Sequence, residues 1–121
     1  MQAESINLAE KLALFTDTWR PKVIAQLNDY QLKLVKLEGE FVWHAHDATD
    51  ELFICLNGEF EMHFRERTVT VRAGELCVVP QGVEHKPVAA NLCEVLIIEP
   101  QGVVNTGALG NELTAPNDDW I

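Results

Sequence analysis

The chain from residue 22 to residue 99 is a succession of short segments in which apolar residues alternate with polar ones. Turn-forming residues, mainly Gly, Asn, Asp and Pro, separate these segments about every 8 to 12 positions. Successive side chains of a β-strand point to opposite faces, so each segment can bury one face and expose the other. The pattern predicts an all-β fold, either a sandwich or a barrel. The predicted strands are 22–27, 30–37, 40–46, 51–56, 60–64, 68–72, 75–80 and 93–99.

The two ends of the chain differ from this central region. Asn7 precedes Glu10 by three positions, which is the pattern of a helix-capping box, and the apolar spacing that follows predicts a short helix over 7–15. Pro21 then ends any helical structure. A chain of 121 residues is large enough for one core but not for two, so we expect a single domain. Its parts are an N-terminal arm (1–20), the strands (22–99) and a coil C-terminal tail (100–121).

Composition and charge narrow the classes of partner. The chain carries 19 acidic and 9 basic side chains, and its formal net charge of -10 opposes binding to phosphate backbones or anionic lipid. We therefore expect neither nucleic acid nor a membrane as a partner. The opening segment has no basic region and is interrupted by Glu4 and Glu10, so we expect no secretory signal and a cytoplasmic location. The three cysteines form no C-x-x-C pair and are expected to be free thiols, mostly in the core.

Two of the four histidines stand in the segment FVWHAHDATDELF, separated by a single residue. His44 and His46 would project to the same side of a strand, and Glu51 at the start of the next strand could return a carboxylate to the same place. His85 is the available fourth ligand from a distant strand. Three imidazoles and one carboxylate suit Mn, Fe, Ni, Cu or Zn rather than Ca or Mg. The alternative is a polar cluster that water and neighbouring side chains satisfy.

These residues resemble the two sequence motifs of the cupin family. The first cupin motif, a Gly, H-x-H, a Glu and a second Gly, is matched by Gly39, His44, His46, Glu51 and Gly58. The second motif is matched by Gly74, Pro80, Gly82 and His85. Two positions depart from the family: Gly39 lies one residue closer to the first His than usual, and Ala89 replaces the closing Asn. The Asn change puts a hydrogen bond near the site in doubt, but not the ligands.

The resemblance implies a cupin double-stranded β-helix, also called a jelly-roll barrel, preceded here by a short helix. It also implies that His44, His46, Glu51 and His85 hold one divalent transition metal, whose identity stays open. Cupins are commonly dimers, so the resemblance implies a homodimer. The chain is similar to the small single-domain cupins of the cupin_2 type, including the group described as mannose-6-phosphate isomerase-like.

Several other side chains are assigned to a face by the alternation. Phe53 and Cys55 share the face of Glu51 and are expected to line the interior, whereas His63 is expected to face outward. Phe41 and Trp43 fall on the face opposite His44. An outward aromatic pair of this kind would favour contact with a second sheet or a subunit interface.

The function expected from these features is binding of, or catalysis on, a small organic molecule at a metal held by three His and one Glu. The two catalytic alternatives are a metal-dependent oxidoreductase, dioxygenase-like, and an isomerase. A noncatalytic ligand-binding or sensor cupin is the alternative from another class, and a cupin with a vestigial site is the third. No catalytic residue is assigned, since Glu51 is the one acid or base evident inside. Few cations lie near the motifs, which disfavours a sugar-phosphate isomerase, and the apolar neighbours favour a small, mostly dry pocket.

Overall fold

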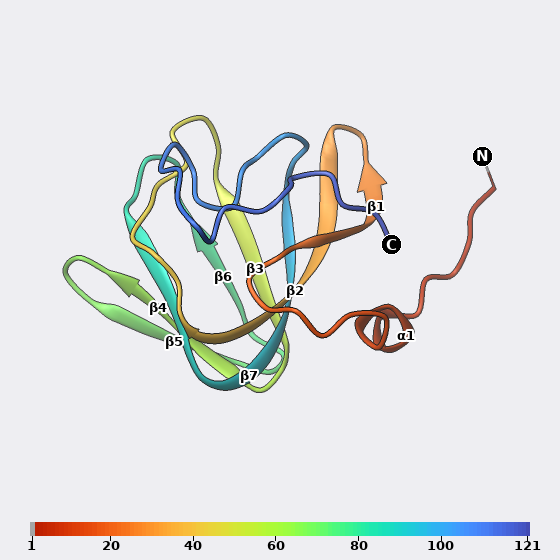
Figure 1. Cartoon of the computed structure of the whole chain (residues 1–121), viewed down its shortest axis with the longest axis horizontal. Coiled ribbons are helices and arrows are strands. Elements are labelled where there is room, and N and C mark those ends of the chain that lie inside the picture. The colour runs from red at the N-terminus through yellow and green to blue at the C-terminus, as the bar shows by residue number, and fades with distance from the viewer. Residues whose placement is uncertain (1) are drawn as a thin grey trace.

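The computed structural model describes residues 2–121, which form one short helix and seven strands (Figure 1). The helix is α1 (Leu8–Leu12), and the strands are β1 (Lys22–Leu27), β2 (Tyr30–Glu40), β3 (Glu51–Asn57), β4 (Glu59–Phe64), β5 (Thr68–Arg72), β6 (Leu76–Val79) and β7 (His85–Pro100). The predicted all-β architecture with a short N-terminal helix is confirmed. Within these residues, no helix has the length and apolar character needed to cross a membrane.

The strands form two antiparallel layers that share β2 and β7, as in a jelly roll. One layer has the order β1-β2-β7-β3-β6, while β4 and β5 extend the other layer from the first half of β7. β7 serves both layers because its residues 85–88 pair with β4 and its residues 94–98 pair with β3. A register shift between Leu37 and Gly39 lets β2 follow the same bend. In Figure 1 the C-terminal tail passes across the barrel and ends beside β1.

Inward-facing side chains of the strands fill the barrel, and a second apolar cluster lies outside it. The interior cluster is Trp19, Val35, Leu37, Phe41, Phe53, Cys55, Phe60, Met62, Val71, Val79, Ala89, Cys93, Val95 and Ile97. The outer cluster joins Leu12 and Phe15 of the N-terminal region to Ile24, Leu34 and Leu96 on the back of the β1-β2-β7 layer. Alternate residues of β2 therefore serve the two clusters, and this fixes which side chains of β2 face the site.

Two turns follow the sequence prediction closely. Asn28 adopts a left-handed conformation (φ 54) between β1 and β2, as an Asn in a tight hairpin does. Gly58 (φ 81) separates β3 from β4, and a Cβ at this position would lie 2.9 Å from the carbonyl oxygen of Leu92. A side chain at position 58 would therefore clash with β7.

Three expectations about where elements begin and end are wrong. The helix ends at Leu12 rather than near Phe15. The predicted strand over 40–46 is largely absent: β2 ends at Glu40, and beyond it His44 makes only an isolated bridge to His85. β7 begins at His85, well before residue 93, because Pro87 and the residues around it continue the ladder with β4.

The missing strand changes the orientation of Phe41. Because residues 41–43 lie outside a regular ladder, strict alternation does not apply to them. Phe41 is 8% exposed and stacks on Trp19 with ring centroids 4.8 Å apart, so it faces inward and not outward. Trp43 is half-buried beneath the guanidinium of Arg65, which lies 3.9 Å from its ring centroid. The outward aromatic pair is therefore absent, and the homodimer stays a prediction that rests on family resemblance.

Candidate metal centre

Backbone pairing brings the two distant histidine segments together. The amide of His44 donates to the carbonyl of His85 at 3.0 Å, and the amide of His85 donates to the carbonyl of His44 at 2.9 Å. His46 lies two residues farther along, and Glu51 is the first residue of β3. All four side chains are buried, at 7% exposure or less. The structure thus brings together the four residues that the sequence predicted.

Carbonyl groups fix the orientation of two of the imidazoles. Nδ1 of His44 lies 2.8 Å from the carbonyl oxygen of Val42, and Nδ1 of His85 lies 2.9 Å from that of Val83. A carbonyl only accepts, so each Nδ1 carries the proton. In the neutral ring Nε2 then holds a lone pair, which is the arrangement of a metal-binding histidine.

The remaining polar atoms converge on one point. Oε1 of Glu51 lies 3.2 Å from Nε2 of His46 and 3.5 Å from Nε2 of His85. One ligand atom from each of the four residues lies within 4.8 Å of every other. Oε1 of Glu51 and Nε2 of both His46 and His85 are buried, and within residues 2–121 none of these atoms has a hydrogen-bond partner. Buried polar atoms without partners are expensive, so their convergence requires a partner that the protein does not supply.

The electrostatics of the cluster favour its metal-binding form. The pKa of His44 is lowered to about 4, mainly by burial and secondly by the neighbouring His85. His44 is therefore neutral near pH 7. Burial acts to raise the pKa of Glu51, but contacts with His46, His85 and Glu99 together lower it by more, which keeps the carboxylate charged. Neutral imidazole and charged carboxylate are the forms that bind a cation.

The donor set fits a divalent transition metal. Two imidazole lone pairs of fixed direction, a third imidazole and a carboxylate oxygen surround one point in a buried site. Nitrogen-rich sets of this kind suit Mn, Fe, Ni, Cu or Zn, whereas Ca and Mg prefer oxygen. His63 lies apart from this cluster and contacts Glu61 at 3.0 Å, as the prediction that it faces outward implies.

A small aromatic-walled cavity lies beside the cluster. Its volume is about 30 Å³, and its lining includes His44, Glu51, Phe53, Phe41 and Trp19. A volume of this size holds about one or two water molecules. Trp19 closes it in an uncommon left-handed conformation (φ 62), with Nε1 donating to the carbonyl of Glu38 at 3.0 Å. The expectation of a small, mostly apolar pocket next to the ligands agrees with this cavity.

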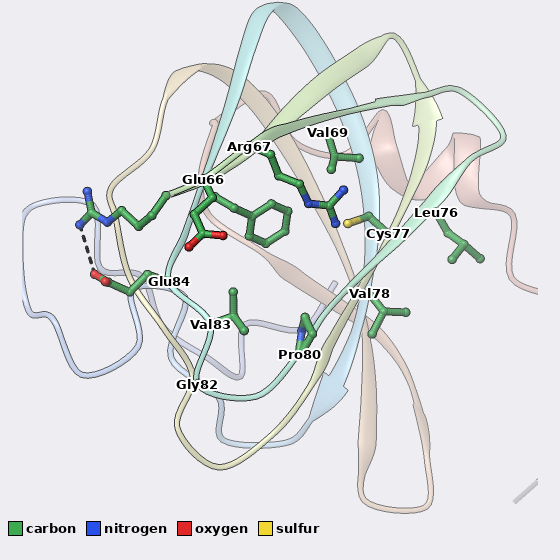
Figure 2. A pocket seen from close by; sticks show the side chains of 12 residues that line it. Glu66, Arg67, Val69, Leu76, Cys77, Val78, Pro80, Gly82, Val83 and Glu84 are labelled. Carbon is green, nitrogen blue, oxygen red and sulfur yellow. Dashed lines mark hydrogen bonds and ion pairs between the residues drawn. The ribbon is translucent and has the colours of Figure 1, made fainter.

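A larger groove of about 640 Å³ lies on the side of the barrel (Figure 2). Arg67 reaches across it toward Cys77, and Glu84 on its rim pairs with Arg65 at 3.2 Å. None of the four clustered residues lines this groove. We therefore place the candidate site in the small interior cavity and not in the larger opening.

Sequence reasoning missed two buried charged residues next to the cluster. Lys33 on β2 and Glu99 on β7 are 1% and 2% exposed, and Nζ of Lys33 lies 3.1 Å from Oε1 of Glu99. Glu99 lines the same small cavity as Glu51. The signal was present in the alternation, since Lys33 is in phase with inward Val35 and Glu99 with inward Ile97. A charged residue at an inward position is the feature to look for.

Comparison with known proteins assigns the family. A model described as "Cupin domain" matches residues 33–99, which is more than half of the chain and includes every motif residue discussed above. The chain belongs to the cupin family. The cupin from Shewanella frigidimarina described as a "cupin-2 domain containing protein" has a crystal structure that is similar to this chain. It is 55% identical, has a TM-score of 0.78, and the match covers 78% of this chain and 93% of that one.

Two further proteins are similar to this chain over most of its length. The "Uncharacterized protein YdbB" of Bacillus subtilis is 35% identical over 89 residues, which cover 64% of this chain and 79% of that protein. The structure of hydroquinone 1,2-dioxygenase from Sphingomonas sp. TTNP3, in complex with 4-nitrophenol, is 26% identical with a TM-score of 0.70. This match covers 80% of this chain but only 32% of the dioxygenase chain. A second structure of the same dioxygenase has 4-hydroxybenzoate bound.

Proposed function

We propose that this cupin is a divalent-metal-dependent oxygenase, dioxygenase-like, that acts on a small aromatic or phenolic molecule. The observation that carries the proposal is the convergence of His44, His46, Glu51 and His85 on one point beside an aromatic-walled cavity. The similarity to a hydroquinone dioxygenase supports the choice of reaction class. Fold and family alone do not determine the substrate, which depends on the residues of the site.

The chain's own residues account for binding and orientation. His44, His46, His85 and Glu51 would hold the metal, which supplies Lewis-acid and redox chemistry when bound. A divalent ion with one carboxylate ligand leaves a formal charge of about +1, which attracts an anionic oxygen such as a phenolate. Phe41, a wall of the cavity, meets the imidazole of His44 edge-on at 5.3 Å between centroids and would pack against a planar ring.

Access to the cavity requires a side chain to move. At about 30 Å³ the cavity is too small for a substituted phenol. Trp19 comes from the connection between α1 and β1 and not from a strand, so its side chain can move without breaking a ladder. We propose that Trp19 swings aside when the substrate binds and excludes bulk water when it returns.

The distribution of cations disfavours a sugar-phosphate isomerase. Arg65 pairs with Glu84, Arg72 pairs with Glu59, and both arginines lie on the surface. The interior cation Lys33 is already neutralised by Glu99. A phosphate group in the cavity would meet no free cation from these residues, so the charge of a bound phosphate would be left uncompensated.

The test is oxygen consumption by metal-loaded protein. Protein loaded separately with Fe(II), Mn(II), Co(II), Ni(II) or Cu(II) would be mixed with hydroquinone and a panel of 4-substituted phenols in an oxygen electrode. We expect substrate-dependent oxygen uptake with at least one metal, lost by 100-fold or more in His85→Ala. His63→Ala is the matched control, because it removes a half-buried histidine outside the cluster, and it should retain full activity.

The contrary outcome separates catalysis from binding. Metal-loaded protein that consumes no oxygen with any phenol would contradict the oxygenase. If phenols nevertheless raise the melting temperature of that protein, a noncatalytic ligand-binding cupin becomes the better account.

A further inference from the structure

A buried ion pair lies directly behind the metal ligand Glu51. Leu52 of β3 pairs with Ile98 of β7, so the preceding residue Glu51 lies opposite Glu99 across the same ladder. Both side chains line the same small cavity inside the barrel, and each carboxyl group shifts the pKa of the other. Lys33 approaches Glu99 from the neighbouring strand β2 at 3.1 Å. Three strands thus supply a continuous line of buried polar groups, Lys33, Glu99 and Glu51.

The two oxygens of Glu99 have different surroundings. Oε1 contacts Nζ of Lys33. Oε2 is buried and has no good hydrogen-bond donor within residues 2–121. The unpartnered oxygen is therefore the one available to the carboxyl group of Glu51. A hydrogen bond between two carboxyl groups needs one proton, which Glu99 and Glu51 would share between them.

Stability alone does not explain the pair. Lys33 and Glu99 are almost completely buried, and a buried ion pair is often no more stabilising than apolar residues of the same volume. Inward positions on the same strands are otherwise apolar, as at Val35 and Ile97. Glu51 stands at the end of β3, where a long side chain has rotamer freedom that a metal site must restrict.

We propose that Glu99, anchored by Lys33, is a positioning residue that holds the carboxylate of Glu51 in its metal-binding orientation. The inference rests on the proposed metal centre, but not on the choice of reaction or substrate. Lys33 fixes Glu99, Glu99 fixes Glu51, and Glu51 faces His46 and His85 with its Oε1 atom. Carboxylates that orient metal ligands in this way typically contribute about 10- to 100-fold to metal affinity.

The experiment is a titration of metal-free protein with Co(II), whose visible absorption reports the coordination geometry, with a competing chelator to measure affinity. The double variant Lys33→Met/Glu99→Leu removes the pair without leaving an unpaired buried charge. We expect it to fold, to bind Co(II) about 10- to 100-fold more weakly, and to show an altered spectrum. Glu99→Gln keeps a hydrogen-bond donor facing Glu51 and should retain most of the affinity and the wild-type spectrum.

Two further variants keep the test decisive. Glu99→Asp retains a carboxyl group but withdraws it from Glu51, so it should weaken Co(II) binding even if the double variant does not fold. Gln31→Leu is the matched control: Gln31 is 2% exposed at the same end of the barrel, but its amide donates to Asp118 at 2.8 Å. Its Co(II) affinity and spectrum should equal those of the wild type.

Two results would overturn the inference, and they differ in what else they overturn. Wild-type protein that binds no Co(II) would remove the metal centre and this role together. Wild-type binding that the double variant and Glu99→Asp leave unchanged would overturn the positioning role alone.

Discussion

The two halves of the barrel interior are built from the same strands but hold opposite kinds of side chain. At one end of β3 stands Glu51, beside three histidines and the Lys33–Glu99 pair. At the other end of β3 stands Cys55, packed among Phe60, Met62 and other apolar residues of the interior cluster. Within residues 2–121, the buried side-chain atoms without a hydrogen-bond partner lie in the polar half. They belong to His46, Glu51, His85, Glu99 and Gln31. The apolar half is closed by side chains at 0% to 1% exposure.

This difference shows where stability and function are separated in the molecule. Burial of apolar area favours folding, by about 25 cal/mol per Å² of area removed from water. Burial of polar groups without partners opposes folding by about 1–3 kcal/mol for each group. The free energy gained by burying the apolar half therefore offsets the cost of burying the polar half. The polar half serves to bind the metal.

The largest expected effect is on the apolar side of the comparison. Phe60→Ala removes a fully buried ring, and we expect it to lower the free energy of unfolding by about 3–5 kcal/mol. Metal affinity of the folded protein should change by less than about twofold, since Phe60 is not among the four ligands. Denaturant titration and Co(II) titration measure the two quantities. A large loss of metal affinity in folded Phe60→Ala would show that the halves are not separate.

The next effect concerns the pH dependence of the metal-free protein. The pKa of His44 is about 4 when folded and about 6.5 when unfolded. The contribution of His44 to stability is therefore fully present above pH 6.5 and falls as pH decreases toward 4, because only the unfolded chain takes up a proton at this side chain. The loss from this group approaches about 3 kcal/mol. Loss of the Glu51 charge adds to it only at lower pH.

Chelator-treated His44→Leu tests that assignment. We expect its free energy of unfolding to vary less between pH 6.5 and pH 4 than that of the wild type, whereas His63→Ala should follow the wild-type curve. An unchanged pH dependence in His44→Leu would contradict the burial of neutral imidazole at this position.

The smallest effect comes from the thiols of the apolar half. The Sγ atoms of Cys55 and Cys93 lie 3.6 Å apart, and burial raises the pKa of both thiols. We expect Cys93→Val to change the free energy of unfolding by less than about 1.5 kcal/mol and to leave Co(II) binding unchanged. A change in metal affinity or in oxygen uptake would give these thiols a role that packing does not.

The sequence predicted the metal half better than its supporting residues. His44, His46, Glu51 and His85 follow from motif spacing, and inward Phe53 and Cys55 follow from alternation. Phe41 was assigned to the wrong face because residues 41–43 leave the ladder, where period-two arguments fail. Alternation along β7 already places Glu99 inward, but its position between Lys33 and Glu51 depends on the register of β7 against both β2 and β3, which local sequence does not determine.

The central claim is that the four converging side chains hold a metal, and metal content tests it most directly. The protein would be purified without a histidine tag or chelator, and its metals would be measured by mass spectrometry together with those of His44→Ala, His85→Ala and His63→Ala. We predict about one transition-metal ion per chain in the wild type and in His63→Ala, and little or none in the other two variants. Substoichiometric metal in the wild type that His44→Ala and His85→Ala do not reduce further would contradict the account.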